Sequence, residues 1–229
     1  RKKVMKGLLI KDLTVIGKQK KFLVIVLLLA VFLTFGSEDT GFAGNYAMLV
    51  LTTLTLTTIS YDEMNGGMMF IFSLPATRKT YVKAKYTFAF LNLLVAATIG
   101  MLLSYVETIF KKVPFQLGDT LTVIMGMMLV MGVMLSVAIP LEFKFGAEKG
   151  RMIVTAAMFG VAFVGIGGYK LLQEVFGIDL FSCLNKLFSG IESEALISCI
   201  IVGGLFVLLV LIMFCSYLIA SNVMRKKEF

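Results

Sequence analysis

The sequence predicts an all-α membrane protein, a single transmembrane domain over residues 1–229 that crosses the bilayer six times with both ends in the cytoplasm. Hydrophobic residues make up 59% of the 229 residues, and the mean hydropathy is +0.93. No polar stretch is long enough to enclose a water-soluble core of its own. Because a bilayer requires all backbone hydrogen bonds to be made internally, and the apolar runs are of helical length, we expect membrane-spanning helices.

Six apolar runs define the expected spans. A helix needs about 20 apolar residues to cross about 30 Å of hydrocarbon. The last four runs reach this length, whereas the first two are shorter and must include flanking residues such as Lys21. The six runs are Phe22–Phe35, Tyr46–Ile59, Tyr86–Phe110, Leu117–Phe143, Met152–Leu171 and Ala195–Ala220.

The distribution of basic residues sets the expected orientation. With a cytoplasmic N-terminus, the inner segments hold 18 of the 22 Lys and Arg residues, and the outer segments hold only Lys111, Lys112, Lys170 and Lys186. Positive charge close to helix ends stays on the cytoplasmic side, so the segment 60–85 is predicted to be an inward-facing loop. The longest outer segment is then 172–194.

The N-terminal segment 1–21 alternates basic and apolar residues at helical spacing, with Leu8 and Val15 among the apolar ones and Lys6 and Lys11 among the basic ones. This pattern fits a basic amphipathic helix in the inner interface, and it fits a plain juxtamembrane anchor equally well. Both interpretations keep the segment at the membrane surface.

Composition argues against several functions. The net charge of +8 follows the topology rather than forming one patch, so we predict no nucleic-acid partner. The chain has no histidine, and its three cysteines have no spacing typical of a disulfide framework or a metal site. No phosphate loop ending in Gly-Lys-Ser/Thr occurs. We therefore predict no catalytic, cofactor or metal site in this chain, which is not expected to be an enzyme.

The segment Ser60–Tyr86 contains the most informative pattern, SYDEMNGGMMFIFSLPATRKTYVKAKY. Two acidic residues precede a glycine pair, and an apolar stretch too short to span the membrane follows. Pro75 ends any helix at the residue before the proline. A short apolar helix at the inner surface is open to two interpretations. It packs on its own bundle, or it is a projection that a cytoplasmic partner grips, because exposed apolar clusters rimmed by charge mark protein contacts.

This segment resembles the corresponding loop in the permease subunits of type-two ABC exporters. In that family an acidic-Gly segment leads to Leu-Pro-x-x-Arg and then to Tyr-x-x-x-Lys-Tyr at the start of the third span. The matching positions here are Glu63, Gly66, Gly67, Leu74, Pro75, Arg78, Tyr81, Lys85 and Tyr86. The basic opening Met5–Leu13 is similar to the family's interfacial N-terminal helix. The short outer loops look like those of compact bacterial permeases that export amphipathic peptides such as phenol-soluble modulins.

The resemblance implies a partner that hydrolyses ATP. The region Glu63–Pro75 would be a coupling helix seated in a groove of a separate ATPase subunit, which would bind ATP and magnesium. Two permease copies, as a homodimer, and two ATPases would form one transporter in the bacterial plasma membrane. The residues implied in ATPase coupling are Asp62, Glu63, Gly66, Gly67, Met69, Phe70, Leu74, Pro75 and Arg78.

The spans also offer candidate residues for a substrate path. Thr52 and Thr55 share one face of the second span, and Met127 and Met131 share one face of the fourth. Threonine hydroxyls also bond between packed helices and methionines also face lipid, so packing and lipid contact are the alternatives to pore lining. No ionisable residue lies at the expected centre of a span, which argues against ion coupling and for energy supplied by a partner.

The sequence thus predicts the permease subunit of an ATP-driven ABC exporter for amphipathic or hydrophobic cargo, with peptides as the specific candidate. The alternative from another class is a membrane-embedded assembly or sensor subunit that transports nothing. An intramembrane enzyme has no supporting group of residues, since it would need a positioned acid, base or metal.

Overall fold

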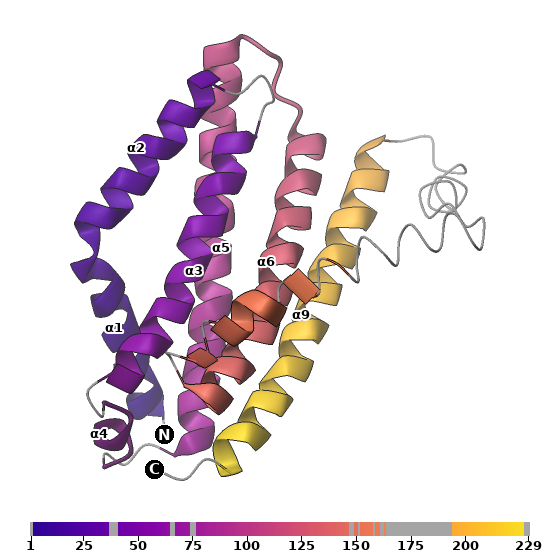
Figure 1. Ribbon diagram of the computed structural model, residues 1–229. Coiled ribbons are helices and arrows are strands. Elements are labelled where there is room, and N and C mark those ends of the chain that lie inside the picture. The colour runs from indigo at the N-terminus through magenta and orange to yellow at the C-terminus, as the bar shows by residue number, and fades with distance from the viewer. Residues whose placement is uncertain are drawn as a thin grey trace.

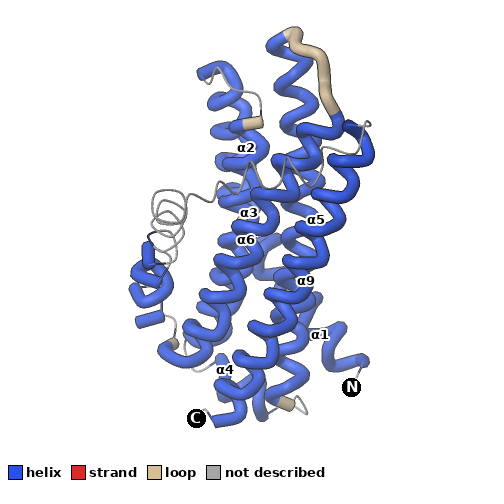
Figure 2. Tube along the Cα trace, turned by 90° about the vertical axis from the view of Figure 1, so that its right-hand side faces the viewer, coloured by secondary structure: helices blue, strands red, loops and turns tan. Residues whose placement is uncertain are grey.

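The computed structural model describes residues 2–36, 41–64, 67–73, 77–146, 149–150, 152–157, 159–160, 163 and 194–226. All regular structure in these residues is helical, which confirms the all-α part of the predicted fold class (Figure 2). The helices are α1 (Lys2–Lys18), α2 (Lys20–Gly36), α3 (Phe42–Glu63), α4 (Gly67–Ser73), α5 (Arg78–Lys111), α6 (Leu117–Phe145) and α9 (Glu194–Lys226). α1 begins and α9 ends at the same end of the bundle, where α4 also lies (Figure 1). We call this the termini end and the opposite one the far end.

Four helices, α3, α5, α6 and α9, are long and apolar enough to cross a membrane. They correspond to the second, third, fourth and sixth predicted spans. α2 contains the first predicted span, but its 17 residues rise only about 25 Å, less than the hydrocarbon thickness. The fifth predicted span lies mostly outside the described residues, as does nearly all of the segment 172–194. Six spans and the sides on which the termini lie therefore stay predictions.

α1 and α2 meet at Gln19, whose backbone amide donates to the Ile16 carbonyl at 2.9 Å. α1 packs on α3 and α5. Its Leu8 and Asp12 are buried, whereas Ile10 and Leu13 are 53% and 61% exposed. Residues 2–18 are thus helical with one side against the bundle, and their location at a membrane interface stays a prediction.

The core of the bundle lies where α3, α5, α6 and α9 meet. Met48, Leu93, Leu135 and Leu209, one from each helix, are at most 1% exposed. α6 and α9 pack against each other along much of their length.

α3 and α5 cross very closely because a glycine faces a glycine near the far end. A Cβ atom on Gly44 would lie 2.5 Å from the Gly100 carbonyl oxygen, closer than any side chain tolerates. About two turns away on α5, Asn92 donates to the Leu51 carbonyl at 2.8 Å and to Thr55 Oγ1 at 2.9 Å. Small residues and interhelical hydrogen bonds drive helix association in a bilayer, where apolar surface alone does not.

Pro140 leaves one carbonyl of α6 without its usual helical donor. Proline has no amide hydrogen, so the carbonyl of Ser136, four residues earlier, receives no bond from position 140. Ser216 of α9 supplies a donor instead, because its Oγ lies 2.6 Å from the Ser136 carbonyl oxygen. The Tyr86 hydroxyl of α5 lies 2.5 Å from the same Oγ, and since Ser216 already donates, Tyr86 is the donor in this second bond. The chain Tyr86–Ser216–Ser136 joins three helices beside the proline.

Candidate functional site

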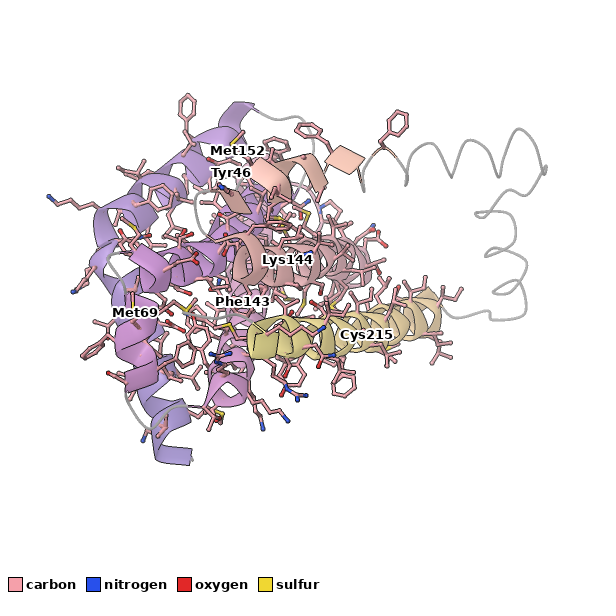
Figure 3. All side chains as sticks on the ribbon, turned by 60° about the horizontal axis from the view of Figure 1, so that its bottom comes forward. Tyr46, Met69, Phe143, Lys144, Met152 and Cys215 are labelled. Carbon is pink, nitrogen blue, oxygen red and sulfur yellow. The ribbon has the colours of Figure 1, made fainter. Side chains whose placement is uncertain are left out.

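α4 is a short helix with one buried and one exposed apolar side. Met68 and Ile71 are 4% and 7% exposed and belong to the main apolar core. Met69 and Phe70 are 65% and 69% exposed. In Figure 3, Met69 lies near the margin of the molecule and Phe143 lies toward its middle. We call Met69 and Phe70 the apolar patch of α4, a pair of large apolar side chains presented at the termini end.

Two glycines allow the chain to close around the end of α3. A Cβ atom on Gly67 would lie 2.7 Å from the Asp62 carbonyl oxygen, so only glycine lets α4 start this close to α3. The carboxylate of Glu63 lies against Gly146, which follows α6. A Cβ atom on Gly146 would be 3.1 Å from Glu63 Oε1, and this glycine has a φ of +82°, a conformation that other residues rarely adopt.

Four charged side chains, Lys11, Asp12, Asp62 and Lys85, join α1, α3 and α5, and we call them the charge cluster. Lys85 Nζ lies 2.7 Å from Asp12 Oδ1 and 2.8 Å from Asp62 Oδ2. Lys11 pairs with Asp62 and lies 3.4 Å from Asp12 Oδ1. Lys85 also donates to the carbonyl and the hydroxyl of Thr58, at 3.3 Å and 3.2 Å. The helix dipole disfavours an anion such as Asp62 near the C-terminus of α3, and the two lysines offset this repulsion.

The charge cluster is buried but balanced. Lys85 and Asp12 are each 1% exposed and Asp62 is 6% exposed, whereas Lys11 reaches the surface. Burial raises the pKa of Asp12 above its usual range, and the adjacent Lys85 and Lys11 oppose this shift. Two cations and two anions leave no net charge. Because removing one partner of a buried ion pair leaves an uncompensated charge, each member of the cluster depends on the others.

Tyr81 connects the charge cluster with α4 and α6. One turn before Lys85 on α5, its hydroxyl donates to Asp62 Oδ2 at 2.9 Å. Its fully buried ring makes an edge contact with Phe72 of α4, with 5.7 Å between centroids, and a tilted contact with Phe143 of α6, at 5.8 Å. A displacement of α4 therefore reaches α3, α5 and α6 through one side chain.

Arg78 ties the start of α5 to the end of α9. The N-cap residue Thr77 accepts a hydrogen bond from the Thr80 amide at 3.2 Å and begins the helix. Arg78 Nη1 donates to the carbonyls of Met224 and Arg225 at 3.3 Å and 3.0 Å. A cation at the C-terminus of a helix satisfies free carbonyls and complements the helix dipole. Arg78 thus caps α9.

The structure brings together part of the predicted coupling set. Asp62, Glu63, Gly67, Met69 and Phe70 meet where α3 passes into α4, Arg78 lies at the end of α9, and Gly66, Leu74 and Pro75 lie outside the described residues. The sequence interpretation missed Asp12 and Thr58, and it reached Tyr81 and Lys85 only through the family resemblance. One sequence signal could have indicated that Tyr81 and Lys85 act together, because they are four residues apart and share a helix face.

The predicted substrate-path residues lie inside the bundle. Thr52 and Thr55 of α3 are both 0% exposed, and Thr55 Oγ1 accepts the hydrogen bond from Asn92 described above. Met131 of α6 is buried, and Met127 is half-buried against the same core. Thr55 therefore takes part in packing between helices.

One comparison with known proteins identifies the family. The sequence profile of the ABC-2 family transporter proteins matches residues 7–225, nearly the whole chain. No curated protein shows significant similarity to the chain. Within the described residues no group of three or more cysteine, aspartate or glutamate side chains is arranged to hold a metal ion. The chain therefore belongs to the ABC-2 transporter family and is a multi-pass membrane permease component of an ABC transporter.

Proposed function

We propose that this chain is the permease subunit of an ATP-driven exporter and that α4 docks on a separate ATPase subunit. The observation that carries the proposal is the division of α4 into a buried side, Met68 and Ile71, and an exposed apolar patch, Met69 and Phe70. The buried side holds the helix on the bundle while the patch stays available to a partner. The sequence has no phosphate loop of its own, so ATP and magnesium bind to the partner.

In this proposal the termini end faces the cytoplasm. The basic residues support it, because Lys6, Lys79, Lys144 and Arg225 belong to the segments at that end. Lys111 and Lys112 follow α5 at the far end, and Lys18, Lys20 and Lys21 belong to the junction of α1 and α2, between the two ends (Figure 1). Retention of positive charge on the cytoplasmic side then places α4 where a cytoplasmic ATPase can reach it.

The mechanism we propose is mechanical. Closure of a pair of ATPases on ATP moves the two α4 helices of a permease homodimer. Because Tyr81 contacts Phe72 of α4, Phe143 of α6 and the Asp62 carboxylate of α3, the displacement passes from α4 into the spans. The charge cluster ties α1 to the same ends of α3 and α5, so these segments move together.

The proposed cargo is amphipathic or hydrophobic, with peptides as the specific candidate, exported across the bacterial plasma membrane. The partly exposed methionines of α6, such as Met127, support an adaptable apolar contact surface. The alternative is an assembly or sensor subunit, which would share the docking surface but move nothing.

Docking is tested by co-purification with a candidate ABC ATPase subunit. Burial of one large apolar side chain contributes about 1.5–3 kcal/mol, so Phe70→Asp should weaken retention of the ATPase by about 10- to 100-fold. Ser73→Asp is the matched control, because it adds the same charge to an exposed position of α4 without removing the apolar patch. Full retention by a correctly folded Phe70→Asp variant would remove α4 as the contact.

Transport is tested separately, in liposomes that contain the permease and its ATPase. An exporter should show ATP hydrolysis that amphipathic peptides stimulate, together with ATP-dependent movement of labelled peptide. A complex that assembles normally but shows neither response supports the assembly or sensor role instead.

A further inference from the structure

A groove of about 470 Å³ runs between α5 and α9 toward the termini end. Its walls are almost entirely apolar, formed by Tyr86, Phe90, Val210, Met213, Phe214 and Tyr217. The hydroxyl of Tyr86, one of the two lining tyrosines, already bonds to Ser216. A ligand in the groove would therefore contact aromatic ring faces and aliphatic side chains along its length.

The groove opens sideways out of the bundle. Phe214 and Val210, two of its lining residues, are 57% and 42% exposed. Both belong to α9, which is long and apolar enough to span the membrane. An occupant therefore enters from the surrounding bilayer.

The end of the groove nearest the termini is cationic. Lys83 lines it and is exposed, and Lys79 lies one helical turn closer to the start of α5. Arg225 and Lys226 stand exposed at the end of α9, which Arg78 holds beside the start of α5. Within the part of the chain that the structure describes, no acidic side chain forms a salt bridge with Lys79 or Lys83.

We propose that this groove binds an anionic phospholipid of the leaflet at the termini end, with one acyl chain along the apolar walls and the headgroup at Lys83. From Lys83 to Phe90 the wall rises about 10 Å, enough for the upper part of an acyl chain. Charge complementarity selects the ligand, because a cationic mouth on an apolar slot at the membrane boundary favours a lipid with a negative headgroup over a zwitterionic one. This site does not depend on the proposed transport function.

The absence of tryptophan from the chain makes a direct assay possible. Phe214→Trp places a single fluorescent reporter on the groove wall. Leu211→Trp is the matched control, since Leu211 is equally exposed on α9, at 56%, but does not line the groove. The full chain is reconstituted in liposomes that contain either brominated phosphatidylglycerol or brominated phosphatidylcholine. Bromine quenches tryptophan on contact, so quenching reports which lipid occupies each position.

We expect phosphatidylglycerol to quench Phe214→Trp at a lower mole fraction than phosphatidylcholine does, with no such preference at Leu211→Trp. In the Phe214→Trp background, Lys83→Glu should reduce the preference at least about fivefold, because one cation near the surface contributes about that factor. Lys20→Glu makes the same charge change on an exposed residue of α2 and should leave the preference unchanged.

Three outcomes would overturn the proposal. Equal quenching by the two lipids at Phe214→Trp means that the groove holds no selected anionic lipid. Weaker quenching there than at Leu211→Trp by both lipids means that a protein surface, such as a second copy or a peptide, covers the groove. A preference that survives Lys83→Glu means that Lys83 is not the headgroup contact. Val210→Trp on the same wall repeats the measurement if Phe214→Trp does not fold.

Discussion

Replacement of Lys85 by methionine tests whether the charge cluster holds α1, α3 and α5 together. Methionine keeps much of the aliphatic length but removes the cation. Lys85 Nζ has carboxylate oxygens at 2.7 Å and 2.8 Å and is 1% exposed. Its loss leaves Asp12 and Asp62 with Lys11, which is 33% exposed. Removal of one partner from a buried ion pair costs about 3–5 kcal/mol, and the total stability of a domain is about 5–15 kcal/mol, so the variant should lose roughly a fifth of its stability or more.

A second substitution separates charge balance from simple loss of contact. Lys85→Met leaves the cluster with one excess negative charge, and the addition of Asp12→Asn restores neutrality with Lys11 paired to Asp62. We expect the double variant to be more stable than the sum of the two single effects predicts, with a coupling of about 1–3 kcal/mol. The favourable coupling follows from restored charge balance in the cluster. It would not arise if Lys85 contributed only van der Waals packing.

The assay is unfolding in detergent followed by far-ultraviolet circular dichroism, with Lys83→Met as the control. Lys83 is exposed and two residues earlier on α5, so its replacement should change the free energy of unfolding by less than about 0.5 kcal/mol. A loss below about 1 kcal/mol for Lys85→Met, or strict additivity in the double variant, would refute the reasoning.

Two further predictions concern the spans. Gly44→Ala should lower the free energy of unfolding by about 1–3 kcal/mol, because the added methyl group meets the backbone of α5, whereas Gly126→Ala, with no atom within 4 Å of its new Cβ, should cause no loss. Ser216→Ala should cost about 1–3 kcal/mol by leaving a buried carbonyl without a donor, and it should cost less in a Pro140→Ala background, where the new amide supplies that donor. Unfolding in detergent measures both, and an equal cost of Ser216→Ala in the two backgrounds would contradict the second.

Hydrophobic length predicted the four long helices α3, α5, α6 and α9 because it is a local property of the sequence. The apolar run Tyr86–Phe110 lies within α5, yet the helix begins eight residues earlier, at Arg78. The prediction stopped at the first polar residues, so Lys85 was assigned to the loop 60–85. A buried lysine is tolerated only when partners from other helices compensate its charge. Those partners are distant in the sequence, so the residues around Lys85 do not indicate that it is buried.

In the candidate site, too, the local features could be predicted from the sequence and the long-range contacts could not. The glycine pair and the apolar stretch that predicted α4 are neighbours in the sequence. The charge cluster joins Asp12 to Lys85, which are 73 positions apart. Neither residue has an unusual neighbourhood, and both belong to segments whose charges also serve as topology signals. The family resemblance indicated Lys85 but not its partner.

The relative strength of these contacts indicates where the bundle can move. Separation of Lys85 from Asp12 and Asp62 would expose buried charge and cost several kcal/mol, so α1, α3 and α5 should stay together at the termini end. Between α5 and α9 the polar contacts of the described residues are the Arg78 cap and the Tyr86–Ser216 bond. Arg78 is only partly buried, so its guanidinium can be solvated by water when the cap opens, and a neutral hydrogen bond such as Tyr86–Ser216 contributes only about 0.5–1.5 kcal/mol. We therefore expect ATP binding by the partner to change spin-label distances between α5 and α9, where the groove lies, and to leave those between α1 and α5 constant. Movement between α1 and α5 would instead mean that the charge cluster opens during the cycle.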